Sequence, residues 1–483
     1  MKQKSLIKNA MYNFLYTGLN LLFPLITSPY ISRTLGASNL GEVNFATSII
    51  SWFILFATFG TATYGVREVA KQRDNKEKLN KLFSEIVVIN GVLSLIVTVI
   101  YFILVVNIDQ FSQELPLYLI MSLSIILNMF AIDWFYQGIE EYKYITIRSA
   151  IFKVISLAAI LMFVRREEHY VIYGLISVLA TSLSGVLNFV YSRKFVQFNL
   201  KGINPFKHIK SLNIFFINTL IISVYTNLDQ TLLGFFVNTK SVAFMNRSKA
   251  VTNLVISVST AMSNVTLPRA SYYINTNKEK FDDLLKIIPK FILWITIPMT
   301  VGVAVLAPNI MLLLGGEEFV EAAVLLQIIS LIIIFSPLSG YLQNQILVPT
   351  GNEKLGLYAA IFSSIASLVL NFTLIPTIGY LGAGFTVVIA ELVAVASRYY
   401  IVKHKLKHKN VNFFDKSTFL YLISGLLMGV LVLFIRNSIE NSFVSLITGV
   451  AIGAAFYFVV LILCKEPIMM LILSKIKDKI KIK

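Results

Sequence analysis

The chain is nearly devoid of cysteine, with Cys464 the only one among 483 residues. A single cysteine excludes an internal disulfide and a cysteine metal cluster. The sequence also lacks the GxxxxGK[ST] phosphate-binding loop and the HExxH zinc motif. His404 and His408 have the i, i+4 spacing of a metal pair, but they lie in the basic run KHKLKHKN, which favours a solvated surface. We therefore expect no ATP hydrolysis, no metal and no cofactor in this chain.

Charged residues are scarce as well. They make up 14% of the chain, against roughly a quarter in soluble globular proteins. Hydrophobic residues make up 56%, and the mean hydropathy is +0.75. Uninterrupted apolar runs such as 83–106 and 444–464 exceed the roughly 18 residues that indicate a membrane span. These features predict an all-α polytopic membrane protein. The first apolar segment lacks a signal-peptidase site and is long enough to span, so we expect no cleaved signal.

Hydropathy predicts fourteen membrane-spanning helices. Of the 42 Lys and Arg residues, seven fall on one face by this count and the remaining 35 fall on the other. The positive-inside rule makes the richer face cytoplasmic and places both termini there. The same rule explains the net charge of +17, so we expect no nucleic-acid partner. The predicted spans are 9–32, 40–66, 83–106, 117–138, 145–165, 171–192, 212–236, 248–268, 286–314, 322–348, 357–376, 382–402, 417–435 and 443–464.

A polar phrase occurs twice, 202 residues apart. Arg67 is followed eight residues later by Asn-Lys-Glu-Lys at 75–78, and Arg269 is followed by the same four residues at 277–280. Six crossings return a chain to its starting side, so this repeat predicts two parallel six-helix lobes with pseudo-symmetry, a feature of transporters. The predicted parts are an N-terminal lobe 1–205, a C-terminal lobe 206–410, and 411–483 with two extra helices and a basic amphipathic tail.

Several motifs resemble one known family. They are LITSPYISRTLGASNLGEVNFATSI (25–49), YGVREVAK (64–71), DWFYQGIEEYKYITIR (133–148), NLDQTLLG (227–234) and LPRASYY (267–273). These resemble the Wzx-type oligosaccharide flippases, in the polysaccharide transporter branch of the multidrug/oligosaccharidyl-lipid/polysaccharide exporter superfamily. The resemblance implies a flippase, not an enzyme, in a bacterial cytoplasmic membrane. It would move undecaprenyl-diphosphate-linked repeat units for capsule or exopolysaccharide by ion-coupled alternating access, in contact with membrane lipids and with a polymerase or other assembly proteins.

Basic residues within spans are the candidates for holding a diphosphate, since charge inside a membrane is costly and is usually functional. Arginine binds two phosphate oxygens together through its planar fork. Snorkelling to the interface is the structural alternative for each residue. The substrate-binding candidates are Arg33, Arg148, Lys153, Arg247 and Lys249.

Three acids also lie within predicted spans. Glu391 is nearest the bilayer centre, Asp229 is flanked by polar residues, and Asp133 lies near the end of its span. An intramembrane carboxylate must be protonated or paired, which suits proton or sodium coupling. We therefore predict ion coupling at Asp229 or Glu391, with structural ion pairs as the alternative.

Two prolines and the repeated arginines are candidates for gating or structure. Pro24 and Pro29 fall inside the first span, where proline removes a backbone hydrogen bond and bends a helix. The bend could contribute to a gate or could serve packing alone. Arg67 and Arg269 are predicted to hold the cytoplasmic ends of paired helices.

Three other functions remain open at this stage. A lipid II flippase would differ only in its sugar. A multidrug or cation antiporter of the same superfamily would favour acids in the first lobe, which instead offers Arg148 and Lys153. A membrane-embedded polysaccharide polymerase would need large outer loops, and the predicted ones are short.

Overall fold

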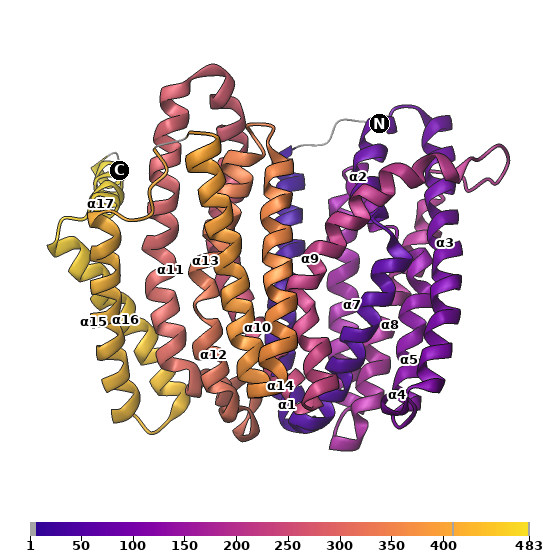
Figure 1. Cartoon of the computed structure of the whole chain (residues 1–483), viewed down its shortest axis with the longest axis horizontal. Coiled ribbons are helices and arrows are strands. Elements are labelled where there is room, and N and C mark those ends of the chain that lie inside the picture. The colour runs from indigo at the N-terminus through magenta and orange to yellow at the C-terminus, as the bar shows by residue number, and fades with distance from the viewer. Residues whose placement is uncertain (1–5, 408–409, 482–483) are drawn as a thin grey trace. The chain divides into compact units, whose positions relative to one another are not determined.

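The computed structural model is all-helical and describes residues 6–407 and 410–481 (Figure 1). These residues divide into two compact units. Unit 1 holds the described residues up to Ser223 together with Asn238–Ala243, and unit 2 holds Val224–Val237 and the residues from Phe244 onward. The predicted domain limits at 205/206 and 410/411 stay a prediction.

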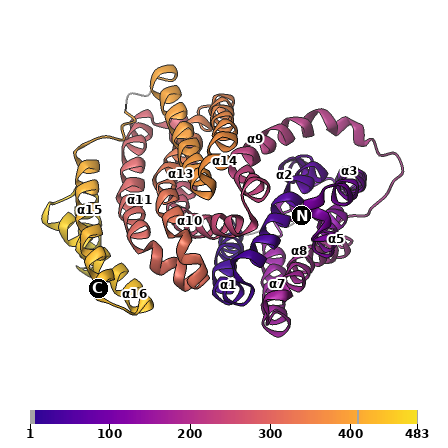
Figure 2. The same cartoon turned by 60° about the horizontal axis from the view of Figure 1, so that its bottom comes forward.

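The helices before the second unit are α1 (Leu6–Thr58), α2 (Thr61–Gln72), α3 (Lys76–Asn107), α4 (Asp109–Ser112), α5 (Leu115–Ile126), η1 (Leu127–Phe130), α6 (Asp133–Gly138), α7 (Tyr142–Phe163), η2 (Glu167–His169), α8 (Tyr170–Ser192) and η3 (Pro205–His208). Neighbours α1, α7, α8, α5 and α3 pack in that order, and α3 returns to α1, so unit 1 is a closed helical bundle (Figure 2). Aromatic side chains fill one end of its core, among them Tyr64, Phe83, Trp134, Phe135 and Tyr136.

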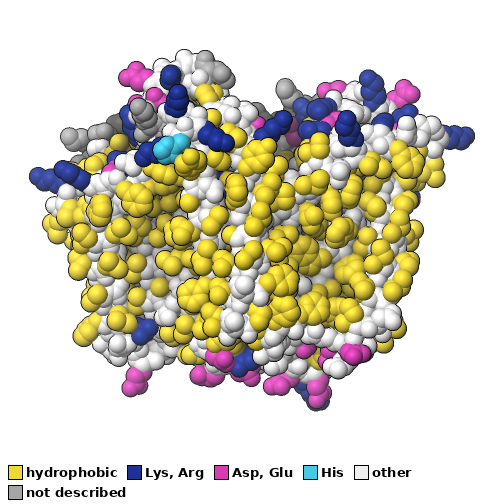
Figure 3. Space-filling view, viewed as in Figure 1, with side chains coloured by type: hydrophobic (Ala, Val, Ile, Leu, Met, Phe, Trp, Pro, Cys, Tyr) yellow, Lys and Arg dark blue, Asp and Glu magenta, His cyan; other side chains and the backbone are white. Residues whose placement is uncertain are grey.

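The later helices are α9 (Ile209–Phe236), α10 (Thr239–Thr276), α11 (Lys278–Gly315), η4 (Glu317–Ala322), α12 (Ala323–Ile329), α13 (Ile332–Tyr341), the π-helical turn η5 (Leu342–Leu347), α14 (Glu353–Tyr400), the π-helical turn η6 (Ile401–Lys405), α15 (Lys416–Ser438), α16 (Ser442–Leu463) and α17 (Pro467–Lys481). In unit 2, α11 packs against α13, α15 and α16, while α14 packs against α12 and α13. On the face that Figure 3 shows, hydrophobic side chains cover the sides of both units, and charged side chains lie at the helix ends.

Two long helices are helical hairpins. A straight helix of 53 residues would be about 80 Å long, far beyond the roughly 30 Å hydrocarbon core. In α1 the break falls at Gly36, whose φ of 70° suits glycine, and Figure 1 shows the ribbon turning back. In α14 the break falls at Ile378 and Gly379, and the Ser363 hydroxyl donates to the Ala390 carbonyl across the two arms at 2.7 Å.

Ten segments of the described chain are long and apolar enough to cross a membrane, or eleven if a bent pair from Glu317 to Leu347 is one span. This differs from the predicted fourteen for two physical reasons. Each hairpin counts as one segment although it contains two predicted spans. The predicted span 248–268 lies in α10, which is not among the ten. Separating the hairpin arms and adding both α10 and the bent pair gives fourteen.

The repeated Asn-Lys-Glu-Lys phrase begins a helix each time. Asn75 is the N-cap of α3, and its side chain accepts a hydrogen bond from the Lys78 amide. Asn277 is the N-cap of α11 and accepts from the Lys280 amide in the same way. The Asn side chain satisfies an amide that has no partner within the helix, and the following Glu favours the helix dipole. The phrase therefore recurs because two helices start alike.

Candidate functional site

Unit 1 contains a polar cavity of about 340 Å³ among α1, α6, α7 and α8. The fourth predicted span is broken there: helix stops after Phe130, and Asp133 starts α6 as its first residue. Broken helices persist at membrane depth only where the freed backbone lines a cavity or is buried in protein. The polar lining comprises Tyr16, Asn20, Thr27, Asp133, Arg148, Ser149, Lys153, Ser156, Tyr173, Ser177, Thr181 and Ser184.

An ion pair crosses this cavity from α7 to α6. The two terminal nitrogens of Arg148 donate to the two carboxylate oxygens of Asp133 at 3.0 and 3.4 Å. Asn188 of α8 donates to the same carboxylate. The Arg148 side chain is 8% exposed and that of Asp133 is 36% exposed, so the carboxylate faces the open space. The buried Nε of Arg148 has no hydrogen-bond partner among the described residues.

Lys153 is the second cation of the cavity, and it has no carboxylate partner among the described residues. Its Nζ donates to the Leu19 carbonyl of α1 at 3.1 Å and lies 4.9 Å from the centre of the Phe23 ring. Both partners are neutral. With Arg148 balanced by Asp133, Lys153 gives the cavity one excess positive charge.

Unit 2 holds a different arrangement, a buried ion pair between α9 and α10. Lys249 Nζ lies 2.6 Å from one carboxylate oxygen of Asp229 and 2.8 Å from the other. It also donates to the Thr226 carbonyl at 2.7 Å. Asp229 is 2% exposed and the Lys249 side chain is 13% exposed. The structure thus joins a predicted substrate ligand to a predicted coupling acid, a pairing that the sequence did not predict.

The second predicted coupling acid, Glu391, shares α14 with Arg398. The two residues are seven positions apart, so they lie two turns along one face, and Glu391 interacts electrostatically with both Arg398 and Lys249. Arg398 is buried and donates to Ser339 and, at 3.4 Å, to Gln343 of the π-helical turn η5. Such turns often mark functional positions in helices.

The remaining predicted ligands lie outside these clusters. Arg33 is exposed on α1, three residues before the break at Gly36. Arg247 is buried on α10, with its guanidinium 5.7 Å from the centre of the Phe319 ring. Neither Arg33 nor Arg247 lines the unit 1 cavity.

α1 stays helical through Pro24 and Pro29 and leaves helical geometry at Gly36 instead. Near the first proline, the Thr27 hydroxyl donates to the carbonyls of Phe23 and Pro24. A gating role for this stretch stays a prediction.

The two repeated arginines are both exposed. Arg67 pairs with Glu68 at 2.9 Å and lies 4.9 Å from the centre of the Phe215 ring of α9, so it links α2 to α9. This contact agrees with a role at helix ends.

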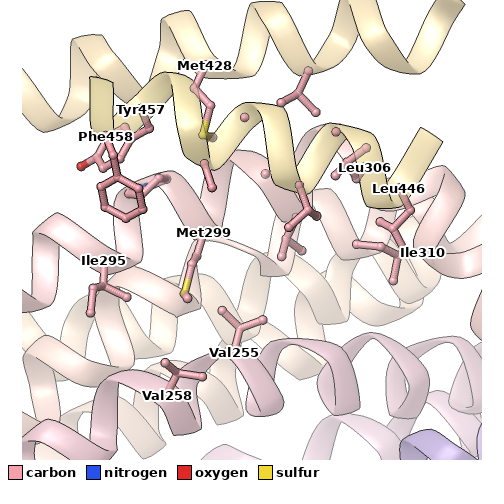
Figure 4. A pocket seen from close by; sticks show the side chains of 18 of the residues that line it. Val255, Val258, Ile295, Met299, Leu306, Ile310, Met428, Leu446, Tyr457 and Phe458 are labelled. Carbon is pink, nitrogen blue, oxygen red and sulfur yellow. The ribbon is translucent and has the colours of Figure 1, made fainter. Parts of the chain in front are cut away.

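An apolar groove of about 400 Å³ lies in unit 2 among α10, α11, α15 and α16. Figure 4 shows Met299, Met428 and Tyr457 projecting into it from these helices. Gly449 and Gly453 of α16 let Val432 of α15 pack closely against that helix. The groove offers no charged side chain.

Comparison with known proteins decides the family. A family model described as polysaccharide biosynthesis protein matches residues 6–274, more than half of the chain. The chain belongs to this family. A second model, described as MatE, matches residues 215–373. The resemblance to oligosaccharide flippases of the multidrug/oligosaccharidyl-lipid/polysaccharide exporter superfamily is thereby confirmed, and so is the expectation of a transporter rather than an enzyme.

Similar members of the family come from several bacteria. A candidate O-antigen transporter of Escherichia coli (strain K12) is 24% identical over 399 residues, which cover 80% of this chain and 94% of that protein. The capsular polysaccharide biosynthesis protein CapF of Staphylococcus aureus is 24% identical over 415 residues, which cover 82% of this chain and 99% of that protein.

Solved structures establish the fold. The lipid II flippase MurJ, in an inward closed conformation, superposes with a TM-score of 0.77 at 16% identity, over 96% of this chain and 100% of that chain. An inward-facing multidrug resistance MATE family transporter gives a TM-score of 0.64 at 15% identity, over 83% of this chain and 99% of that chain. The prediction of an all-α polytopic membrane protein is confirmed.

Sequence reasoning missed two side chains of these sites. An Asn in an apolar helix carries no charge, so the sequence alone does not single out Asn188. Arg398 falls near the cytoplasmic end of the predicted span 382–402, where basic residues are common. Its spacing of seven from Glu391 was the available signal, because it puts both charges on one helix face.

Proposed function

We propose that this chain moves diphosphate-linked oligosaccharides on a polyprenyl carrier from the inner to the outer leaflet of a bacterial cytoplasmic membrane. The sugar would be a repeat unit for O-antigen or capsule, as the names of the related proteins suggest. The proposal is carried by the polar cavity of unit 1 with its excess positive charge at Lys153.

The chemistry of such a substrate suits that cavity. Its diphosphate diester carries two negative charges, and its sugar presents hydroxyl groups. The cavity offers Lys153, the Arg148 guanidinium and a lining of Ser, Thr, Tyr and Asn side chains. Lys153 now donates to a neutral carbonyl, and a phosphate oxygen is the stronger acceptor for an ammonium group. A diphosphate could therefore replace the Leu19 carbonyl at Lys153.

The carrier tail needs a different surface. A polyprenyl chain is long and apolar, so it gains by contacting hydrocarbon or apolar side chains. The groove beside α15 and α16 offers methionine, aromatic and branched aliphatic side chains. This surface supports a lipid-linked substrate over a small soluble one.

Energy for transport would come from an ion gradient in this proposal, because the sequence has no nucleotide-binding loop. Asp229 and Glu391 are the acids proposed for coupling, and both lie in unit 2.

Export of surface polysaccharide tests this function. A strain that lacks its own repeat-unit flippase would receive the wild-type chain, Lys153→Met, or the control Lys201→Met in an exposed loop. We expect the wild type and the control to restore surface polysaccharide, while Lys153→Met does not at equal membrane levels. No export by the wild type, in a host that makes the cognate repeat unit, would reject the function.

The fold of MurJ favours lipid II as a second candidate substrate. Depletion of the lipid II flippase in the same host separates the two. Rescue of growth by this chain, without restored surface polysaccharide, would favour lipid II.

A further inference from the structure

The ion pair of unit 2 places the Lys249 ammonium group against a carboxylate and a main-chain carbonyl. Lys249 Nζ donates to Oδ1 of Asp229 at 2.8 Å and to the Thr226 carbonyl at 2.7 Å. The second carboxylate oxygen lies 2.6 Å from Nζ and has no hydrogen-bond partner among the described residues. Any further anion that binds Lys249 must therefore lie beside the Asp229 carboxylate.

Asp229 is the partner that an incoming anion would disturb most. A phosphate beside Lys249 would lie close to the carboxylate, and two negative charges repel strongly where water is scarce. The Thr226 carbonyl carries no net charge and is not repelled in this way. Asp229 is 2% exposed, so water cannot replace the lost cation. A buried carboxylate that loses its cation becomes protonated rather than remaining charged.

The surrounding charges point the same way. Glu391 of α14 interacts with Lys249 and Arg398, Tyr225 of α9 interacts with both Glu391 and Arg398, and Arg247 lies two residues before Lys249 on α10 against Phe319. Lys249 is paired with Asp229, so this pair has no excess positive charge, unlike the unit 1 cavity with Lys153. An anion that binds Lys249 leaves the Asp229 carboxylate without its cation, and a proton is the simplest replacement.

We propose that Lys249 and Asp229 form an exchangeable pair that links anion binding to proton uptake. When a phosphate group binds the Lys249 ammonium group, the Asp229 carboxylate accepts one proton from the solvent. When the phosphate leaves, the proton is released and the pair forms again. This inference rests on the proposed function, because it assigns a coupling step to the transport of an anionic lipid.

Proton uptake on binding is directly measurable. The probe is citronellyl-diphosphate-linked N-acetylglucosamine, a diester whose two negative charges do not titrate near neutral pH. Titration calorimetry of the purified full chain, in two buffers of different ionisation enthalpy at one pH, gives the protons bound per probe. We expect about one proton per probe for the wild type and almost none for Asp229→Asn. Lys249→Arg should keep the uptake, and Lys249→Gln should weaken binding about tenfold or more.

Glu440→Gln, at an exposed carboxylate between α15 and α16, serves as the matched control and should leave proton uptake unchanged. The exchange is wrong if Asp229→Asn binds the probe with wild-type uptake, or if only Glu391→Gln abolishes it. A wild-type chain that does not bind the probe also overturns the exchange.

An infrared difference spectrum of the wild type needs no variant. Addition of the probe should produce a new protonated-carboxyl band, and its absence contradicts the proposal. Restored surface polysaccharide together with probe binding but no proton uptake would reject the exchange and leave the transport function standing. Loss of export by the wild type would reject the transport function itself.

Discussion

The substitution Lys153→Met in the unit 1 cavity should lower the affinity for an anionic substrate while leaving the folding stability almost unchanged. Methionine has nearly the length of lysine but no charge, so it fills the same space between α7 and α1. The wild-type ammonium makes one hydrogen bond, to the Leu19 carbonyl at 3.1 Å. A hydrogen bond to a charged group contributes about 1.5–3 kcal/mol, but holding a cation in an apolar helix has a cost of similar size. We therefore expect folding stability to change by less than about 1 kcal/mol.

Binding should respond much more strongly. In the proposed complex Lys153 donates to a phosphate oxygen, and the thioether that replaces its ammonium group in the variant has no hydrogen to donate. Loss of one charge-assisted hydrogen bond of about 1.5–3 kcal/mol weakens affinity by about 10- to 150-fold. The measurement is the dissociation constant of the citronellyl-diphosphate sugar for the wild type and Lys153→Met, with Lys201→Met as control.

Two results would refute this reasoning. An affinity within about twofold of the wild type would mean that Lys153 does not contact the anion. A large drop in thermal stability with equal affinity would mean that Lys153 serves packing through Leu19 and Phe23. Lys153→Arg should retain most of the affinity, since it keeps the charge and a donor.

Three further outcomes are expected. Arg148→Met should destabilise the detergent-solubilised chain by about 2–4 kcal/mol, because the part-exposed Asp133 carboxylate loses its cation. Adding Asp133→Asn to this variant should recover most of the loss in melting temperature. If the two substitutions instead lower the melting temperature additively, the ion-pair account is wrong. Burial opposes ionisation of Asp415, but hydrogen bonds from Lys290 and the Thr418 amide outweigh it and lower the Asp415 pKa. The stability that the ionised Asp415 contributes is present above about pH 4 and is lost as the pH falls below that value. Asp415→Asn should therefore flatten the acid side of the profile of stability against pH. Cysteines placed in residues 193–210, after replacement of the native cysteine, should resist impermeant reagents in intact cells, and labelling there would overturn the predicted topology.

Much of the fold follows from hydropathy and charge. The predicted gaps between the first two spans and between 357–376 and 382–402 contain the breaks at Gly36 and Gly379. Within spans, prediction was poorer. The break before Asp133 and the π-helical turn after Tyr341 lie in predicted continuous spans, because hydropathy measures composition and does not register the backbone's geometry.

The sequence identifies the candidate residues, because a charge inside the membrane has a high free-energy cost. It does not identify the residues with which they pair. Each charge inside a membrane is conspicuous in the sequence, which is why Arg148, Lys153, Asp229 and Lys249 were all named. Pairing depends on which helices are neighbours and how they are rotated. Asp229 and Lys249 are twenty positions apart on different helices, so no periodicity connects them. Only the packed structure shows that one neutralises the other.

The two units use lysine in related ways with different surroundings. Lys153 donates to a main-chain carbonyl of α1, and Lys249 donates to one of α9, the first helix of the predicted second lobe. Only Lys249 has a carboxylate beside it. A lysine that donates to a neutral carbonyl attracts an anion with its full positive charge. In the proposed exchange, a lysine that is paired with a carboxylate must leave that carboxylate before it can bind another anion. If the lobes arose by duplication, adding an acid to one copy would convert a simple anion site into a proton-linked one, without a nucleotide site.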